Sequence, residues 1–425
     1  MDNNIFWKRR NNIFKKIMPK SIILFFAGRN LTNFKSSFDI NRNFYYLTGI
    51  EEEDAVLMLV KGTNNSNEQT FLFLKETDKL KNLWEGETLS FLQAHRKSAI
   101  KIENIKNIIS LKDFLFLFLR NCNNTIGTII KQIYFPFNEN QDFTNNSHII
   151  SSISRQIIDH FPYIKIENIS PLISQMRTIK DIIEIKKIQK AININNKALY
   201  DLMPLIKPQM NENNINAYYN YLLATKNTKP AFENIVASGK NALILHYHKK
   251  NNILKKNDLI LLDLGVNYQN YNSDISRCFP INGKFTIQQK EIYKIVLNAN
   301  KKIINWLKPG KTFEELNIYG KQILFEGLKK IGILTNPKEL INYCYHGLGH
   351  HLGLEVHDVG NTKQPLVENN IITVEPGLYL ANLNLGIRIE DNILITKNGS
   401  YNLTQNVIKE INEIENAIKK KHFIS

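Results

Sequence analysis

A short segment near the C-terminus, residues 346–357, is rich in histidine and glycine and limits what this chain can fold into. Four of the ten histidines in the 425-residue sequence lie there, among glycines at positions 347, 349 and 353. Each glycine would destabilise a helix by about 1 kcal/mol relative to alanine. The segment also lacks a glutamate directly after its first histidine, so it is not a zinc-binding HEXXH helix. The pattern indicates a loop and a strand end that direct imidazole groups into a cleft.

Two pairs of carboxylates on apolar strands are expected to share that cleft. In each pair, the first acid ends an apolar run and the second follows beyond a turn. The pairs are Asp263 with Asp274 and Glu375 with Glu390. Side chains alternate between the two faces of a strand, so Arg388 and Glu390 are expected on the same face of the strand over 387–390. A buried carboxylate is costly unless it meets a cation or a strong donor. Four acids and a nearby histidine therefore predict an oxygen-rich site for divalent ions such as Mn²⁺, Co²⁺ or Fe²⁺.

Five of these side chains match, in order and local context, the metal ligands of the pita-bread metallopeptidases: Asp263, Asp274, His350, Glu375 and Glu390. Taken singly, an aspartate after an apolar run is usually a turn or cap residue, but the five together favour a metal site. The flanking strings resemble Xaa-Pro aminopeptidase (aminopeptidase P); they are LHY at 245–247, HGLGHHLGLEVHDVG at 346–360, TVEPGLY at 373–379 and GIRIED at 386–391. The resemblance covers nearly the whole chain, including an N-terminal segment near residues 43–57.

The resemblance implies a hydrolase that holds two divalent metal ions, with Mn²⁺ as the favoured ion. Asp263 would bind one ion, and His350 with Glu375 would bind the other. Asp274 and Glu390 would bridge the two. A hydroxide between the ions would attack the N-terminal Xaa-Pro bond of a peptide, and Glu375 would pass the proton to the leaving proline nitrogen.

The resemblance also assigns roles beside the metals. His246, His346 and His357 would donate hydrogen bonds to the scissile carbonyl and to the tetrahedral intermediate. Arg388 would orient a ligand or a partner such as Tyr379. The sequence leaves open whether four other side chains act in the site or pack elsewhere: Trp84, His248, His351 and Tyr379.

Other functions remain open at this point. A prolidase, which cleaves only Xaa-Pro dipeptides, would use the same ligands. A methionine aminopeptidase would also use them, although the N-terminal domain argues against that enzyme. A non-catalytic pita-bread protein that binds peptides, proteins or nucleic acid would typically lack several ligands, whereas this chain keeps all five.

The formal net charge of +16 raises nucleic acid or an anionic membrane as possible partners. The lysines are scattered among asparagine and isoleucine residues rather than gathered in a stripe, so we predict peptide substrates with proline at position two and no nucleic-acid or membrane partner. The three cysteines show no CXXC spacing and indicate a reducing compartment; they are Cys122, Cys278 and Cys344.

No targeting segment is evident from the sequence. Residues 1–20 are interpreted as an ordinary first helix, the apolar run 22–26 is too short for a signal sequence, and the run 114–119 is too short to span a bilayer. We expect a cytoplasmic enzyme, and the resemblance suggests a homo-oligomer, either a dimer or a tetramer.

The predicted fold class is α/β (α+β) with two domains. Residues 1–170 form an N-terminal α/β domain of the creatinase/prolidase type, which by resemblance serves substrate access and oligomerisation, and residues 171–425 form the pita-bread catalytic domain. Strands are predicted in the first domain at 22–26, 43–47, 55–60, 70–74 and 132–136, and helices near 89–107 and 149–160. Helices are predicted in the second domain at 181–203 and 212–225 and after capping boxes at Thr286 and Thr312.

Overall fold

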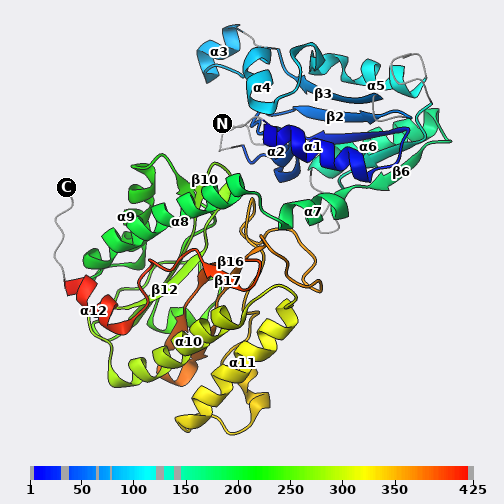
Figure 1. Cartoon of the computed structure of the whole chain (residues 1–425). Helices are drawn as coiled ribbons and strands as arrows, with labels where there is room; N and C mark the ends of the chain where they lie inside the picture. The colour runs from blue at the N-terminus through cyan, green and yellow to red at the C-terminus, as the bar shows by residue number, and fades with distance from the viewer. Residues whose placement is uncertain are drawn as a thin grey trace. The chain divides into compact units, whose positions relative to one another are not determined.

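The computed structural model describes residues 4–29, 38–63, 67–76, 79–120, 129–137 and 145–419. It divides into two units, Met1–Ser174 and Gln175–Ser425 (Figure 1). Cys122 lies outside the described residues. Within the described residues, no helix combines the length and the apolar character that crossing a bilayer requires.

A six-stranded mixed sheet forms the centre of the first unit, in the order β4-β3-β2-β1-β5-β6. The strands are β1 (Ser21–Phe26), β2 (Val56–Lys61), β3 (Glu68–Leu74), β4 (Ile105–Asn107), β5 (Gln132–Phe135) and β6 (Lys165–Asn168). The helices are α1 (Asn4–Lys16), α2 (Arg42–Thr48), α3 (Lys79–Glu85), α4 (Phe91–Ser98), α5 (Leu111–Leu119) and α6 (Asn145–His160), and α7 (Ser170–Thr178) follows at the boundary. β1, β2 and β3 pair antiparallel, whereas the other neighbours pair parallel.

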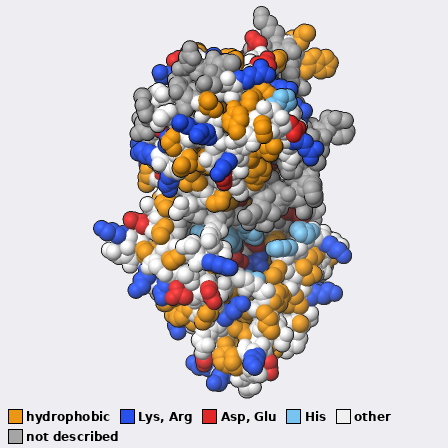
Figure 2. Space-filling model, turned by 90° about the vertical axis from the view of Figure 1, so that its right-hand side faces the viewer, with side chains coloured by type: hydrophobic (Ala, Val, Ile, Leu, Met, Phe, Trp, Pro, Cys, Tyr) orange, Lys and Arg blue, Asp and Glu red, His pale blue; other side chains and the backbone are white. Residues whose placement is uncertain are grey.

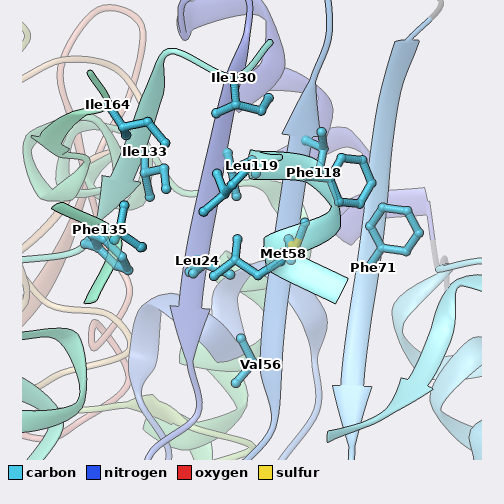
Figure 3. Close-up of a cluster of buried hydrophobic side chains, with 14 of the residues drawn as sticks. Leu24, Val56, Met58, Phe71, Phe118, Leu119, Ile130, Ile133, Phe135 and Ile164 are labelled. Carbon is cyan, nitrogen blue, oxygen red and sulfur yellow. The ribbon is translucent and has the colours of Figure 1, made fainter. Parts of the chain in front are cut away.

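Alternate residues of the central strands build the core of this unit (Figure 3). Leu24 of β1 and Met58 of β2 are register partners and are both fully buried. Phe118 of α5 covers the same face and lies 5.8 Å from the ring of Phe71 in β3, measured between centroids. Side chains alternate between the two faces of a strand. The face that α5 covers is therefore closed to water, and the opposite face packs against other helices.

Two of the predicted elements of the first unit are wrong. Residues 43–47 were expected to form a strand and lie instead in α2, because the Asn41 side chain accepts hydrogen bonds from the first backbone amides and Gly49, at φ 68°, ends the helix. The helix predicted over 89–107 ends at Ser98, since Ala99 adopts a left-handed conformation with φ 56°. Beyond it the chain forms a short 3₁₀ turn and then β4.

Long helices and short antiparallel strands alternate in the second unit. The helices are α8 (Ile182–Leu202), α9 (Glu212–Ala224), α10 (Ile287–Trp306), α11 (Phe313–Lys330) and α12 (Ile411–Lys419). The capping boxes predicted at Thr286 and Thr312 are confirmed, and Asp181, at the start of the helix predicted over 181–203, forms a third one. In each, the capping side chain accepts from the backbone amide three residues on. These local bonds fix where α8, α10 and α11 begin.

The strands of the second unit form four small antiparallel sheets: β11-β10-β7, β12-β9-β8, β13-β16-β17 and β14-β15. Their bounds are β7 (Lys229–Pro230), β8 (Ile235–Ser238), β9 (Leu259–Leu264), β10 (Val266–Tyr268), β11 (Tyr271–Asn272), β12 (Ile275–Pro280), β13 (Ile371–Val374), β14 (Gly377–Leu380), β15 (Leu385–Arg388), β16 (Asp391–Ile395) and β17 (Ser400–Asn402). Figure 1 shows α8 and α9 on one side of these strands and α10 and α11 on the other. This arrangement places the ends of β9, β12, β13 and β15 in the interior.

Candidate metal centre

The first pair of predicted acids lies on the antiparallel strands β9 and β12. Asp263 is in β9, where its register partner is Ser276, and Asp274 directly precedes β12. Both residues are buried, Asp263 with 8% and Asp274 with 5% of its surface exposed. The strands therefore carry two acids into the interior, where each needs a compensating partner.

The second pair lies on the strands that follow α11. Glu375 comes directly after β13, and Glu390 lies between β15 and β16. The Ser276 hydroxyl donates to Glu390 Oε2 at 2.8 Å, and the Glu390 backbone amide donates to the Ser276 carbonyl at 3.1 Å. Ser276 thus joins the two pairs, although they are about a hundred residues apart in the chain.

Predicted ligands from distant segments meet at this point. Asp274, His350 and Glu390 each bring one ligand atom within 4.8 Å of the others. His350 Nε2 lies 3.5 Å from Asp274 Oδ2 and 3.7 Å from Glu375 Oε1. Asp263 interacts directly with Asp274. All five side chains named from the sequence therefore lie in one site.

Burial and mutual repulsion perturb the acids of this site. Burial, together with the charges of Glu390 and Asp263, raises the pKa of Asp274 well above its ordinary value. Burial and the charge of Glu390 likewise raise the pKa of Glu375. For Glu390, burial and the charge of Asp263 raise the pKa to about 7. The charged forms of Asp274, Glu375 and Glu390 are therefore disfavoured unless positive charge lies beside them.

The donor set fits divalent metal ions. Within the described residues, Asp263 Oδ1 and Asp274 Oδ1 are buried oxygens without a hydrogen-bond partner. A buried, ionised carboxylate oxygen that lacks a donor is costly, and a bound cation is one partner that removes this cost. Carboxylate oxygens with one imidazole nitrogen are ligands that Mn²⁺ and similar ions accept.

Arg388 is the protein's own cation at this site, and it is buried. Its Nη2 donates to Asp263 Oδ2 at 2.6 Å, its Nε donates to Ser276 Oγ at 2.9 Å, and its Nη1 donates to the Tyr379 hydroxyl at 3.0 Å. Three groups on three strands are therefore oriented by one planar guanidinium, which a lysine could not reproduce.

His346 continues this hydrogen-bond chain. The Tyr379 hydroxyl accepts from Arg388, so its own proton is free to donate to His346 Nε2 at 3.0 Å. His346 Nδ1 lies 2.6 Å from the Gly347 carbonyl and donates to it. Burial and the charge of Arg388 lower the pKa of His346 to about 4, in keeping with a neutral ring. His346 would have to exchange one of these bonds before it could donate to a substrate carbonyl.

Two further histidines lie beside the ligands. The rings of His357 and His350 are 4.2 Å apart between centroids. Partial burial and the nearby rings of His350 and His246 lower the pKa of His357. His246 is exposed and belongs to the loop between β8 and β9. Figure 2 shows histidine side chains grouped on one face of the molecule, beside acidic and basic side chains. Of the three histidines predicted to face the substrate, His346 lies beside Glu375, His357 lies beside His350, and His246 lies near His357.

Of the four side chains whose roles the sequence did not decide, Tyr379 lies in the site and the other three lie elsewhere. Tyr379 belongs to the site through Arg388 and His346. His248 is exposed and pairs with Glu233 at 2.9 Å. His351 is buried with its ring edge-on to Phe313, so it packs in the core. Trp84 belongs to the first unit and is 87% exposed.

Sequence reasoning missed the residues that hold the site in position. Ser276 follows Asp274 by two residues in a strand, and this same-face spacing was the one signal that could have found it. Asp358, next to His357, is buried against Arg177 at 2.5 Å and Lys180 at 2.9 Å. Nothing local in the sequence predicts that ion cluster, because its members are about 180 residues apart.

Two family models match the chain. Residues 186–397 match the model described as "Metallopeptidase family M24", and residues 6–126 match "Aminopeptidase P, N-terminal domain". Among named proteins, the Xaa-Pro aminopeptidase of Haemophilus influenzae is 32% identical over 97% of this chain and 96% of its own length. The Xaa-Pro aminopeptidase of Escherichia coli is 31% identical over 96% of each.

Solved structures agree with these matches. The aminopeptidase P of E. coli with the inhibitor Pro-Leu superposes with a TM-score of 0.87 at 29% identity, covering 98% of both chains. Proline aminopeptidase P II from Yersinia pestis superposes with a TM-score of 0.88 at 29% identity, covering 98% of this chain and 99% of that one.

Proposed function

The chain belongs to the Xaa-Pro aminopeptidases of metallopeptidase family M24, and from this premise we propose that it removes the N-terminal residue from peptides with proline at position two, using two divalent metal ions. The chain is a metal-dependent hydrolase, and the predicted fold class is confirmed. The observation that carries the proposal is the meeting of Asp274, His350 and Glu390 within 4.8 Å beside two further acids.

The five ligands suit two ions. Asp263 would hold one, His350 and Glu375 would hold the second, and Asp274 and Glu390 would contact both. We propose Mn²⁺ because the donor set is rich in oxygen. When bound, the two cations would polarise the scissile carbonyl and lower the pKa of the attacking water.

Glu375 is the proposed proton carrier. Its Oε1 lies 3.7 Å from His350 Nε2, and its Oε2 lies 3.8 Å from His346 Nδ1, so the carboxylate faces the centre of the site. It would take a proton from the water that attacks the carbonyl carbon. It would then deliver that proton to the proline nitrogen as the C–N bond breaks, which releases the N-terminal residue and a peptide that begins with proline.

His246 and His357 are the proposed donors to the substrate carbonyl. An N–H from either ring would stabilise negative charge that develops on the carbonyl oxygen. His346 and Tyr379 would keep Arg388 aligned, and Arg388 would keep Asp263 aligned. This division follows from the bonds that His346 already makes.

Proline selectivity is proposed to arise beside His246 and His357. The amide nitrogen of an Xaa-Pro bond carries no hydrogen, and the ring restricts the preceding residue. An exopeptidase that depended on that N–H would bind such peptides poorly. An apolar slot next to these two rings would accept the proline ring instead.

The proposal is tested with the purified chain and Xaa-Pro peptides of two, three and five residues, each assayed with Mn²⁺ and with a chelator. Cleavage of all three lengths that depends on the metal is expected. Cleavage of the dipeptide alone would assign a prolidase, and cleavage of Xaa-Ala peptides at the same rate would refute the specificity. Failure to hydrolyse any peptide while binding metal would point to a binding protein.

We further propose that the enzyme acts in the cytoplasm as a dimer or tetramer and has no nucleic-acid partner. The described cysteines, Cys278 and Cys344, are buried free thiols, as expected in a reducing compartment. Light scattering of the purified chain would measure the assembly.

A further inference from the structure

Glu212, the first residue of α9, has a side chain that is buried completely and surrounded by neutral donors. These donors are the Ser238 amide at 2.7 Å, the Ser238 hydroxyl at 2.7 Å, Asn241 Nδ2 at 3.1 Å, the Tyr247 hydroxyl at 2.9 Å and the Asn252 amide at 3.0 Å. A buried carboxyl group is costly unless its oxygens are bonded in this way. The arrangement therefore depends on all of these partners staying in place.

The donors bracket a single segment, residues 238–252, which carries His246. One end of the segment is fixed twice, because the Glu212 amide donates to the Asn252 carbonyl at 3.0 Å while the Asn252 amide donates to the Glu212 carboxyl group. The other end is fixed through Ser238. A carboxyl group at the start of a helix thus ties both ends of the loop to α9.

Tyr247 connects this tether to His246. The Tyr247 side chain is buried and reaches inward to Glu212, while the adjacent His246 side chain is exposed. Within the described part of the chain, the ring of His246 makes no hydrogen bond that could hold it. The direction of His246 is therefore set by its backbone, and Tyr247 is the nearest anchor of that backbone.

We propose that Glu212 is a positioning residue, which acts through Tyr247 to hold His246 against the substrate carbonyl. This inference rests on the proposed function. A purely structural role would lower stability and leave the chemical step unchanged. A positioning role would lower the rate of the chemical step, because a misplacement of about 1 Å can reduce a rate about 10²-fold.

The test uses Tyr247→Phe and Glu212→Gln in the full chain. Tyr247→Phe removes only the hydroxyl, and Glu212→Gln places an amide N–H where an acceptor is needed. We expect kcat to fall about tenfold in the first and about 10²-fold in the second, with KM nearly unchanged, since the lost alignment matters in the transition state. Tyr247→Phe keeps the test valid if Glu212→Gln fails to fold.

A double-mutant cycle separates the two roles. In a His246→Ala background, Tyr247→Phe should change kcat by less than about twofold, because its effect passes through the missing ring. The matched control is Tyr293→Phe, a buried tyrosine whose hydroxyl donates to the Lys409 carbonyl at 2.8 Å. It should lower the melting temperature about as much as Tyr247→Phe and leave kcat unchanged.

Hydrogen exchange tests the tether without relying on activity. Amides of residues 238–252 should exchange faster in Tyr247→Phe and Glu212→Gln than in the wild type. Unchanged exchange, or faster exchange with unchanged kcat, overturns the proposal, as does an undiminished effect of Tyr247→Phe in the His246→Ala background. If the wild type cleaves no Xaa-Pro peptide, the proposed function fails, and the exchange rates alone then decide whether Glu212 holds the loop.

Discussion

Replacing Asp358 with asparagine should destabilise the second unit by about 3 kcal/mol. The Asp358 carboxylate contacts Arg177 at 2.5 Å and Lys180 at 2.9 Å, and the three side chains are at most 2% exposed. Burial opposes ionisation of Asp358, but the charges of Lys180 and Arg177 outweigh burial and lower its pKa from 3.8 to about 2. A depression of roughly two pKa units corresponds to about 2.5 kcal/mol. Asparagine would also leave the buried Lys180 without its acidic partner and Arg177 with Glu355 alone, at 2.7 Å. Breaking a buried ion pair in this way usually costs about 3–5 kcal/mol.

The sign of the pH dependence follows from the lowered pKa. Because the folded pKa lies below the unfolded one, the stabilisation is fully present above about pH 5 and disappears as the pH falls through about 2. The difference in free energy of unfolding between the wild type and Asp358→Asn should therefore fall by about half at about pH 3.

Urea unfolding followed by circular dichroism measures the loss of stability in Asp358→Asn at neutral pH and again at about pH 3. Asp201→Asn is the matched control, because Asp201 pairs with Lys197 on the exposed side of α8. That change should cost no more than about 0.5 kcal/mol. A loss of less than about 1 kcal/mol for Asp358→Asn at neutral pH, or a loss that does not depend on pH, would refute the reasoning.

Three further substitutions probe the site directly. Glu375→Gln should lower turnover by at least about 10³-fold, because it removes a proton carrier and a charged ligand; near-normal turnover would exclude Glu375 as the base. His357→Ala should reduce kcat by about 10²–10³-fold, and an unchanged kcat would mean that this ring does not face the substrate. Arg388→Lys keeps the charge but cannot bond Asp263, Ser276 and Tyr379 together, so Mn²⁺ affinity measured by titration calorimetry should fall about 10–100-fold. Equal affinity in Arg388→Lys would show that charge alone suffices.

Local signals in the sequence predicted much of the second unit. Asp181, Thr286 and Thr312 could be identified as helix starts because a capping box is made within four residues. The strands that end in Asp263 and Glu375 were visible as apolar runs closed by an acid. In the first unit, the aromatic run 43–47 favoured a strand, but the capping side chain of Asn41 outweighed that preference.

The supporting residues could not be predicted in the same way. Glu212 is bonded to groups 26 to 40 residues away, and Asp358 to groups about 180 residues away. Glu212 meets its partners only after α9 has packed, and Asp358 meets its partners only after the segment around His357 has packed. The sequence could be used to predict which side chains meet at the candidate site, whereas the residues that position those side chains depend on tertiary contacts.

Elemental analysis after Mn²⁺ loading and gel filtration tests the central claim most directly. The wild type should retain about two ions per chain, and a variant with both Asp274→Ala and Glu390→Ala should retain almost none while keeping its circular dichroism spectrum. A folded wild-type chain that retains no metal, or a double variant that retains as much as the wild type, would contradict the account.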